Sequence, residues 1–402
     1  MPLSSVVGAQ SIIRPGVCTS STRPASPHDG QVIYMTDVDQ TAVWDGTQWT
    51  VLAPIASGRN VIHNGAMQVH QRGTSAPVTA YVYFTADRFA LQWTTAGDWT
   101  QSVENDAPTG TGFRKSLKML CTTADASPAA GDILTVQQRI EGQNLQHFAK
   151  GTASAKPFTL SFWVKSNVTG TYIANLSDID NTRTVSAPYT ISASATWEQK
   201  TITFPADTTG AFDNDNQMSL IVQFALVVGS NYTSGTLSTV WTTTTNPNRY
   251  VGQPNVASAV GNYWQVTGVQ FEAGAVATPF EFEDYSTTLA KCQRYFFRTN
   301  SSASAYGSHG LGSVLTTYAN CMLHLPVTMR AIPYLINSSN LMINTQSNES
   351  YAVTSLTFNT TVSTPDDVNL VATIATSLAA QYCRLLSNNN VNGYVEVSAD
   401  LY

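Results

Sequence analysis

The chain has 402 residues, enough for two or three domains with cores of their own. Only 11% of its residues are charged, against roughly 25% in an average soluble protein. The formal net charge of −6 and the lack of any Lys/Arg cluster exclude the basic face of a general nucleic-acid binder. The longest apolar run, residues 220–228, is too short to span a membrane.

Ser, Thr, Asn and Gln supply the polarity that charged residues usually provide. Such a surface has little colloidal repulsion, so we expect much of it to be covered by sister subunits or by a larger particle. The five cysteines are far apart in the sequence and form no Cys-x-x-Cys pair: Cys18, Cys121, Cys292, Cys321 and Cys383. This pattern predicts reduced, buried side chains and neither a disulfide framework nor a zinc site.

Residues 1–58 are predicted to form an N-terminal arm and a small β-meander. Residues 1 to about 22 show no hydrophobic period, which is typical of an arm. Three short strands are expected after it, at Val32–Thr36, Ala42–Trp44 and Gln48–Leu52. So short a meander cannot bury a core alone. Trp44 and Trp49 are therefore predicted to contact other subunits or a socket in a larger assembly.

Residues 59–284 are predicted to form an antiparallel β-sandwich. Many segments alternate apolar and polar residues and are separated by Gly, Asn and Asp turns. The clearest alternation is in Met218, Leu220, Val222, Phe224, Leu226 and Val228. In the last strand Trp264 and Val266 differ in parity from Val269 and Phe271, so a bulge at Gly268 is expected to return all four to one face.

Residues 285–402 are predicted to form a junction helix and a C-terminal β-rich unit. Before the helix, Phe280 and Phe282 alternate as in a short strand. Ser286 is the expected N-cap, and Leu289, Cys292 and Tyr295–Phe296 follow at helical spacing. Val371–Leu386 fits both a helical and a strand pattern. The fold class expected for the whole chain is all-β.

Several phrases in the sequence resemble those of tailed-bacteriophage structural proteins. The most specific is the series Val-Gln-Phe-Glu-Ala-Gly, Ala-Thr-Pro-Phe-Glu and Leu-Ala-Lys-Cys-Gln-Arg-Tyr-Phe within residues 269–296. Others are residues 64–67 (Asn-Gly-Ala-Met), 71–73 (Gln-Arg-Gly), 86–89 (Ala-Asp-Arg-Phe), 329–333 (Met-Arg-Ala-Ile-Pro) and 398–401 (Ser-Ala-Asp-Leu). Relatives often have Trp where Phe89 stands. The resemblance favours strands in the ambiguous segment 371–386.

The resemblance implies a tail fibre, head fibre or related virion appendage in which a carbohydrate-module-like jelly roll precedes a small C-terminal β-domain. It implies attachment to other virion proteins through the N-terminal region, and we expect a homotrimer that contacts a host-surface polysaccharide. The N-terminus has no basic residue before Arg14 and no long apolar core. We therefore expect no signal peptide, synthesis in the bacterial cytoplasm and a final location in the virion.

No catalytic motif and no cofactor fingerprint occurs in the sequence. Three carboxylate pairs, Asp178/Asp180, Asp213/Asp215 and Asp366/Asp367, lie among turn-forming residues and are interpreted as solvated turns. A glycan-degrading tailspike-like enzyme stays open as an alternative, because folding can bring distant acids together. Calcium at either of the first two pairs also stays open. A purely architectural decoration or baseplate component is the third alternative.

Four aromatic residues in loop-like surroundings are the candidate glycan contacts: Trp93, Trp99, Trp241 and Tyr250. Flat rings at an exposed site, with amide and carboxylate hydrogen bonds, are what sugar binding uses. Packing of the same rings at subunit interfaces is an equally open interpretation. Arg72 and Asp87 are candidates for a structural ion pair at one end of the sandwich, and Arg88 could equally stack on the aromatic ring beside it.

Overall fold

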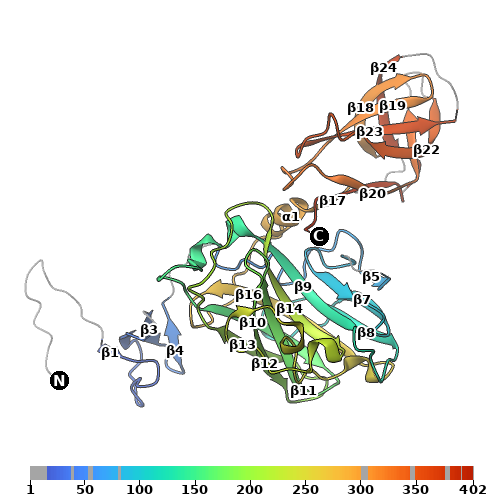
Figure 1. The fold of residues 1–402 in the computed structure, drawn as a ribbon. Coiled ribbons are helices and arrows are strands. Elements are labelled where there is room, and N and C mark those ends of the chain that lie inside the picture. The colour runs from blue at the N-terminus through green and yellow to red at the C-terminus, as the bar shows by residue number, and fades with distance from the viewer. Residues whose placement is uncertain are drawn as a thin grey trace, which may run out of the picture.

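The computed structural model describes residues 16–37, 40–52, 58–79, 83–299, 307–344, 349–375, 381–390 and 392–401. In these parts the chain is all-β, with one α-helix and several single 3-10 turns. Figure 1 shows a small N-terminal sheet, a large sandwich and a C-terminal lobe that contains a barrel. The fold class expected from the sequence is confirmed, and the boundaries assigned to the three units stay predictions.

The N-terminal sheet has four strands, β1 (Gly16–Cys18), β2 (Val32–Met35), β3 (Gln40–Trp44) and β4 (Trp49–Val51). The three predicted strands are present, while β1 lies in the segment that was expected to be an unstructured arm. It pairs in parallel with β2. Ile33, Met35 and Ala42 form a core of only three buried residues.

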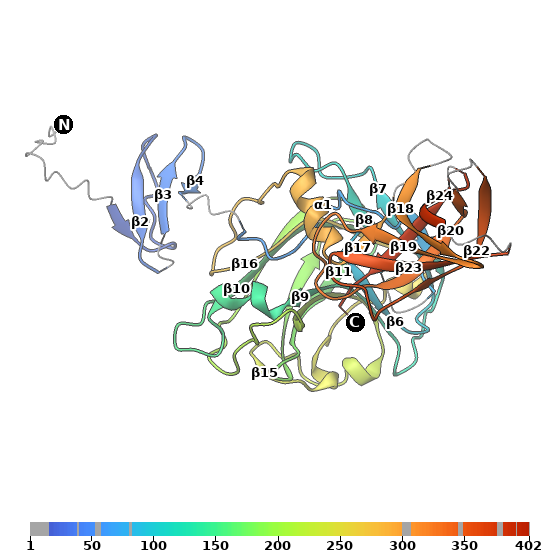
Figure 2. The ribbon, with the colours of Figure 1, turned by 90° about the horizontal axis from the view of Figure 1, so that it is seen from above.

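Two antiparallel six-stranded sheets form the sandwich, seen from two sides in Figures 1 and 2. The first sheet has the order β13 (Glu198–Phe204), β10 (Phe158–Ser166), β16 (Tyr263–Ala273), β8 (Ser116–Thr123), β7 (Asp98–Glu104) and β5 (Ser75–Pro77). The second has the order β15 (Thr242–Thr243), β12 (Arg183–Ile191), β11 (Gly170–Asp178), β14 (Met218–Val228), β9 (Ile133–Glu141) and β6 (Ala90–Trp93). This is the predicted jelly-roll sandwich.

The core between the two sheets is built by the alternating residues that the sequence singled out. Trp264, Val266, Val269 and Phe271 of β16 are all buried in it. The β10–β16 register shifts opposite Gly268, which has a φ of +62°. The predicted bulge is therefore confirmed. A Cβ on Gly268 would lie 2.6 Å from the Phe113 ring, so both the backbone conformation and the space require glycine there.

Five 3-10 turns lie in the loops of the sandwich: η2 (Gly142–Asn144), η3 (Gln146–Phe148), η4 (Ser230–Tyr232), η5 (Asn246–Asn248) and η6 (Val256–Ser258). Three of them, η4, η5 and η6, lie in the long segment between β14 and β16, from which Trp241 and Tyr250 were expected to offer exposed rings. Tyr250 of this loop packs instead on Ile133, Ile173 and Ala225, on the outer face of the second sheet. The loop therefore covers part of that face.

The junction helix α1 (Tyr285–Gln293) begins directly after Asp284, so the predicted N-cap at Ser286 is wrong by two residues. The helix ends before Tyr295, and Phe296 lies in a strand. The short strand predicted around Phe280 and Phe282 is absent from the described structure. Their rings pack on Phe113 at centroid distances of 4.9 and 5.1 Å. Alternation there reflects packing of a non-strand segment on the sandwich.

The C-terminal lobe has two sheets. A three-stranded sheet has the order β17 (Phe296–Arg298), β25 (Tyr394–Ser398) and β20 (Tyr334–Ser339). A closed barrel has the order β18 (Ser308–Leu315), β19 (Tyr318–His324), β23 (Asp367–Ile374), β22 (Ser350–Phe358), β21 (Leu341–Asn344) and β24 (Gln381–Asn388). The ambiguous segment 371–386 thus begins in β23 and ends in β24, as the resemblance favoured.

Candidate functional site: a surface hollow at Trp93

Three of the four predicted glycan contacts are buried. Trp99 lies in β7 and is 1% exposed, and its Nε1–H donates to the Ala96 carbonyl at 2.8 Å. Trp241 is 9% exposed, and its Nε1–H donates to the Pro205 carbonyl at 2.8 Å. Tyr250 is fully buried. The expectation that these rings are exposed in loops is wrong. The polar group of each ring makes a hydrogen bond within the fold, so the ring can be buried without leaving that group unpaired.

Trp93 is the one predicted ring that reaches a surface hollow. It ends β6 and is half-buried, with part of its ring packed against the sandwich core. The hollow has a volume of about 380 Å³ and is lined by Trp93, Thr95, Gly97, Asp98, Thr123, Ala124 and Asp125. An indole therefore lies beside two carboxylates and two hydroxyls.

A tight turn between β6 and β7 builds one wall of this hollow. The Trp93 Nε1–H donates to the Gly97 carbonyl at 3.2 Å, which fixes the plane of the ring. Gly97 has a φ of +72°, and a Cβ there would lie 2.5 Å from the Thr123 carbonyl oxygen. Only glycine allows this close approach of the two chain segments. The register of β7 on β8 shifts directly after Asp98, whose side chain is exposed.

The opposite wall is held by the loop after β8. The Asp125 backbone N–H donates to the Ala257 carbonyl at 2.8 Å, and the Asn255 side-chain amide donates to the Asp125 carbonyl at 2.8 Å. Burial raises the pKa of the neighbouring Cys121 thiol, and the charges of Asp98 and Asp125 raise it further. The hollow thus combines a fixed apolar ring with a negative field and several hydrogen-bond acceptors.

The two tryptophans predicted to make virion or subunit contacts lie opposite each other in the N-terminal sheet. Trp44 pairs with Trp49 across the β3–β4 hairpin, with ring centroids 5.7 Å apart in an edge-on arrangement. Both rings are half-buried. The Asp45 Oδ1 accepts from the backbone N–H groups of Thr47 and Gln48, which stabilises the turn between β3 and β4. Their role in attachment stays a prediction.

The carboxylate pairs divide into one buried ion pair and several turns. Asp178 is buried and its Oδ2 accepts from Lys150 Nζ at 2.6 Å, so its interpretation as a solvated turn is wrong. Burial raises the pKa of Asp178. Asp215 accepts a backbone N–H bond from Gln217 within its own turn, and Asp180 accepts one from Asp213 in a distant segment. Across the described parts of the chain, no three His, Cys, Asp or Glu residues group in a way that would hold a metal ion.

The phrases that carry the sequence resemblance converge on the junction between the sandwich and the C-terminal lobe. Arg72 pairs with Asp87 at 3.5 Å and also with Asp400, from the last phrase of the sequence. Arg88 stacks on Tyr295 at 3.3 Å from the ring centroid, and its Nη1 faces Asp400 at 3.8 Å. The predicted ion pair is confirmed, and Arg88 does stack on a ring, but the ring is that of Tyr295 and not of the adjacent Phe89.

Two further arginines complete this junction. Arg294 makes a two-point contact with Glu141 of β9 at 3.0 and 2.9 Å. Arg330 donates from Nε to the Ala399 carbonyl at 2.6 Å and from Nη1 to the Asn216 carbonyl at 3.0 Å. Sequence reasoning missed Glu141 and Asp400 as partners, because their separation in the chain gives no local signal. The junction is a buried charged network that holds the two lobes together.

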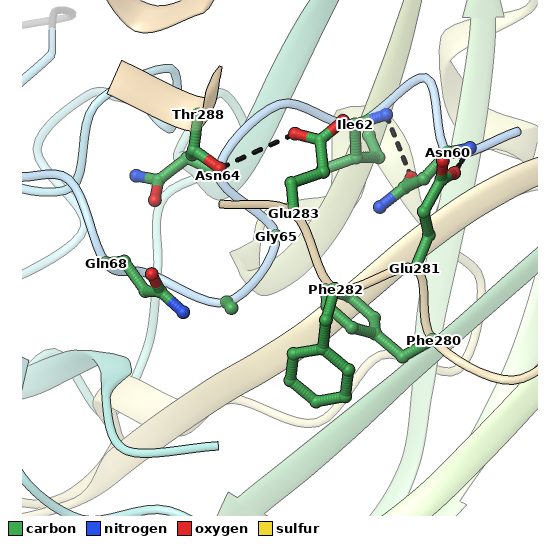
Figure 3. Close-up of a pocket in the computed structure, with 11 residues that line it drawn as sticks. Asn60, Ile62, Asn64, Gly65, Gln68, Phe280, Glu281, Phe282, Glu283 and Thr288 are labelled. Atoms are coloured by element: carbon green, nitrogen blue, oxygen red, sulfur yellow. Dashed lines mark hydrogen bonds between the residues drawn. The ribbon is translucent and has the colours of Figure 1, made fainter. Parts of the chain in front are cut away.

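The segment with the Pro-Phe-Glu phrase packs directly on residues 58–65, and the space between the two segments is too small for a ligand. Figure 3 shows residues Phe280–Glu283 crossing the segment that contains Asn60 and Gly65. Glu281 accepts from the backbone N–H groups of Gly58 and Asn60 at 2.6 and 2.9 Å. The cavity between the segments has a volume of about 20 Å³, room for about one water molecule.

Among the described residues, no helix has the length and apolar character to cross a bilayer. No protein-family model and no curated protein sequence matches the chain. Solved structures do match it. The enzymatically active domain of bacteriophage CBA120 tailspike protein 4 is 16% identical with a TM-score of 0.30, over 54% of this chain and 21% of that one.

Two carbohydrate-binding modules also match. TmCBM61, solved with beta-1,4-galactotriose, is 9% identical with a TM-score of 0.26, over 54% of this chain and 99% of the module. The family 11 module from Clostridium thermocellum, solved with a beta-1,3-1,4-mixed-linked tetrasaccharide, is 8% identical with a TM-score of 0.26, over 51% of this chain and 98% of the module. TM-scores this low carry no argument about the function of this chain.

Proposed function

We propose that the protein is a non-enzymatic structural component of a tailed-bacteriophage virion, of the tail-fibre or head-fibre type, and that it contacts a host-surface saccharide. The observation that carries the saccharide contact is the Trp93 hollow, where a half-buried indole lies beside Asp98 and Asp125. Sugar rings stack on indole faces, and carboxylates accept hydrogen bonds from sugar hydroxyls.

Three features support the virion assignment. The phrases that resemble phage appendage proteins build a rigid junction between two β-lobes, which suits a protein that transmits force. The chain has few charges for its length, which suits a surface covered by neighbours. The N-terminal sheet has a core of three residues and two paired tryptophans, so it gains stability if it docks on another protein.

A homotrimer attached through its N-terminal region would give the weak saccharide contact the multivalency that it needs. Linked copies of a weak site gain avidity by orders of magnitude without any new contact. The final location is then the virion, after synthesis in the host cytoplasm. Light scattering of the purified protein tests the subunit number directly, and a monomer at all concentrations would contradict this part of the proposal.

The saccharide contact is tested with Trp93→Ala against a matched control, Trp197→Ala. Trp197 is also half-buried, but it lies directly before β13 and outside the hollow, and its Nε1–H donates to Asp106 at 3.2 Å. We expect Trp93→Ala to weaken binding to isolated host polysaccharide about fivefold per site, the magnitude of a lost ring contact. Trp197→Ala should bind as the native protein does. Equal binding by all three proteins would contradict the site.

Two assays separate the proposed role from its alternatives. A reducing-sugar assay on host envelope polysaccharide tests the tailspike-like enzyme, and release of reducing ends by the purified protein would overturn the non-enzymatic assignment. Competition of phage adsorption by the purified protein tests recognition. Failure of an excess of the native protein to block adsorption would favour a purely architectural component.

A further inference from the structure

A second hollow lies where the C-terminal lobe meets the sandwich. It has a volume of about 360 Å³ and is lined by Arg72, Tyr83, Phe84, Phe296, Arg298, Ile336, Asn337, Tyr394 and Glu396. The first three of these residues belong to the sandwich, and the others come from β17, β20 and β25. Binding sites occur preferentially at such meetings of two lobes.

The three-stranded sheet presents different residues on its two faces. Phe297, Leu335, Val395 and Val397 pack into the hydrophobic core of the barrel. The opposite face carries Phe296 and Arg298 from β17 and Tyr394 and Glu396 from β25, and it lines the hollow. One face of the sheet therefore packs on the barrel, and the opposite, more polar face lines the hollow beside the sandwich.

Two guanidinium groups lie flat against aromatic rings in this hollow. Arg72 is 3.6 Å from the centroid of Phe296, and Arg298 is 3.9 Å from the centroid of Tyr394. Stacking fixes the plane in which the N–H donors point and keeps the charge partly dehydrated. Both arginines are thus positioned in advance, so a ligand would not have to order them.

The two arginines differ in what they already bind. Arg72 is neutralised by Asp87 and Asp400 behind it. Within the described structure, Arg298 uses only Nη1 in a hydrogen bond, to the Glu396 Oε1 at 3.0 Å. Its side chain is 31% exposed, so Nε and Nη2 remain accessible from the hollow. A guanidinium with donors to spare suits a carboxylate, which it can bind at two points.

The rest of the lining suits a sugar ring. Phe84 is half-buried and Ile336 is 44% exposed, and both offer apolar surface for the faces of a ring. Asn337 is exposed, and its amide donates to the Tyr394 hydroxyl at 2.9 Å, which places a polar edge beside Arg298. The volume is near the lower end of ligand pockets, about 300–1,000 Å³, so it suits one or two sugar units.

We propose that this junction hollow binds an acidic saccharide, a sugar unit that carries a carboxylate, with Arg298 as the carboxylate ligand. The site is distinct from the Trp93 hollow, and the proposal stands whether or not that hollow binds sugar. The nearest carboxylate, Glu396, already pairs with Arg298 Nη1 at 3.0 Å, so a bound carboxylate would share the guanidinium with it. The rest of the net charge of −6 is largely screened beyond about 8 Å at physiological salt.

The test is a titration of the full chain with three probes: D-glucuronate, D-glucose and acetate. Glucose offers the ring without the carboxylate, and acetate offers the carboxylate without the ring. We expect glucuronate to bind at least tenfold more tightly than either of the others. Arg298→Gln should weaken glucuronate binding about ten- to a hundredfold, because a charged two-point contact is lost. Arg298→Lys keeps the charge without the planar fork, so it should give an intermediate loss.

Trp197→Ala, which lies outside both hollows, is the control, and it should bind glucuronate as the native protein does. The melting temperature of each variant shows that it is folded before it is titrated. The proposal is overturned if glucuronate does not bind in the millimolar range, or if folded Arg298→Gln binds it as well as the native protein. It is also overturned if acetate matches glucuronate, which would mean an unspecific anion contact only.

Discussion

The Trp93 hollow and the lobe junction are built in opposite ways. The hollow comes from a single tight turn and one neighbouring loop, and its chemistry is at the surface. The junction draws residues from both ends of the chain, Arg72 and Asp400 among them, and buries their charges. A buried charge without its partner is far more costly than an exposed one. The junction therefore constrains the sequence strongly, while the hollow constrains it little.

This difference explains where the recognisable phrases of the sequence lie. Phrases such as Gln-Arg-Gly and Ala-Asp-Arg-Phe contribute residues to the junction, where Gln71 also donates from Nε2 to the Phe296 carbonyl at 2.9 Å. They report how the lobes are joined. The saccharide contact proposed at Trp93 lies in a segment with no such phrase. Resemblance and ligand contact are thus carried by different residues.

The largest effect on stability is expected from Arg72→Ala, which removes a charged residue from the lobe junction. The change leaves the buried carboxylate of Asp87 without its guanidinium partner and leaves Asp400 with only the 3.8 Å contact to Arg88. We expect the free energy of unfolding to fall by about 3–5 kcal/mol, measured by urea denaturation. Polysaccharide binding at the Trp93 hollow should persist below the denaturation range. The exposed Arg114→Ala is the control and should change stability by no more than about 0.5 kcal/mol. Equal effects of the two changes would refute a structural role for Arg72.

Gly97→Ala tests the turn that builds the hollow. A side chain there requires an unfavourable left-handed backbone and meets the Thr123 carbonyl oxygen at 2.5 Å. We expect a loss of about 2–3 kcal/mol in stability, together with loss of saccharide binding. Gly252 has a φ of +93° with nothing within 4 Å of the added Cβ, so Gly252→Ala should show the backbone cost alone, about 1 kcal/mol. If the two alanine variants lose the same stability, the close approach of Gly97 to the Thr123 carbonyl does not contribute to the cost.

The stability of the protein should also depend on pH through Asp87 of the junction, and this effect is smaller. Burial raises the pKa of Asp87 to about 6, while Arg72 and the Gln71 side chain oppose the rise and Asp400 adds to it. A carboxyl group whose pKa is raised on folding contributes stability that is fully present below its unfolded value of 3.8 and is lost as the pH rises through about 6. Relative to Asp87→Asn, the native protein should therefore gain about 1 kcal/mol between pH 7 and pH 5. Urea denaturation at the two pH values measures the difference, and a constant gap would contradict the assignment.

Much of the sandwich could be predicted because its signals are local. Alternation placed residues 218–228 in a central strand, and a change of parity located the bulge at Gly268. The pairing of Arg72 with Asp87 could be predicted because both residues were expected at the same end of the sandwich. The start of α1 was misplaced because Asp284 and Ser286 are about equally good capping residues, so local composition does not choose between them. In the structure the N-cap is Asp284, although it makes no side-chain cap.

The exposure of single rings was not predictable in the same way. Trp99, Trp241 and Tyr250 have polar neighbours in the sequence, yet each is buried. Trp241 donates to the Pro205 carbonyl and the Tyr250 hydroxyl to Gln223, and both partners are distant in the chain. The same holds for Asp178 at the end of β11, whose partner Lys150 lies in the loop after η3. Local composition reports how polar a segment is, and tertiary contacts decide which of its side chains reach the surface.

Asp98→Asn is expected to have the smallest effect on stability and isolates the chemistry of the hollow. The side chain is exposed at the start of β7, so we expect stability to change by less than about 0.5 kcal/mol. Asparagine keeps the size of the side chain and weakens it as an acceptor for sugar hydroxyls, so saccharide affinity should fall about threefold. The matched control is Asp29→Asn, on the N-terminal sheet, which should leave affinity unchanged. If both variants bind as the native protein does, the Asp98 carboxylate takes no part in the site, and Trp93 and Asp125 would remain as the saccharide contacts.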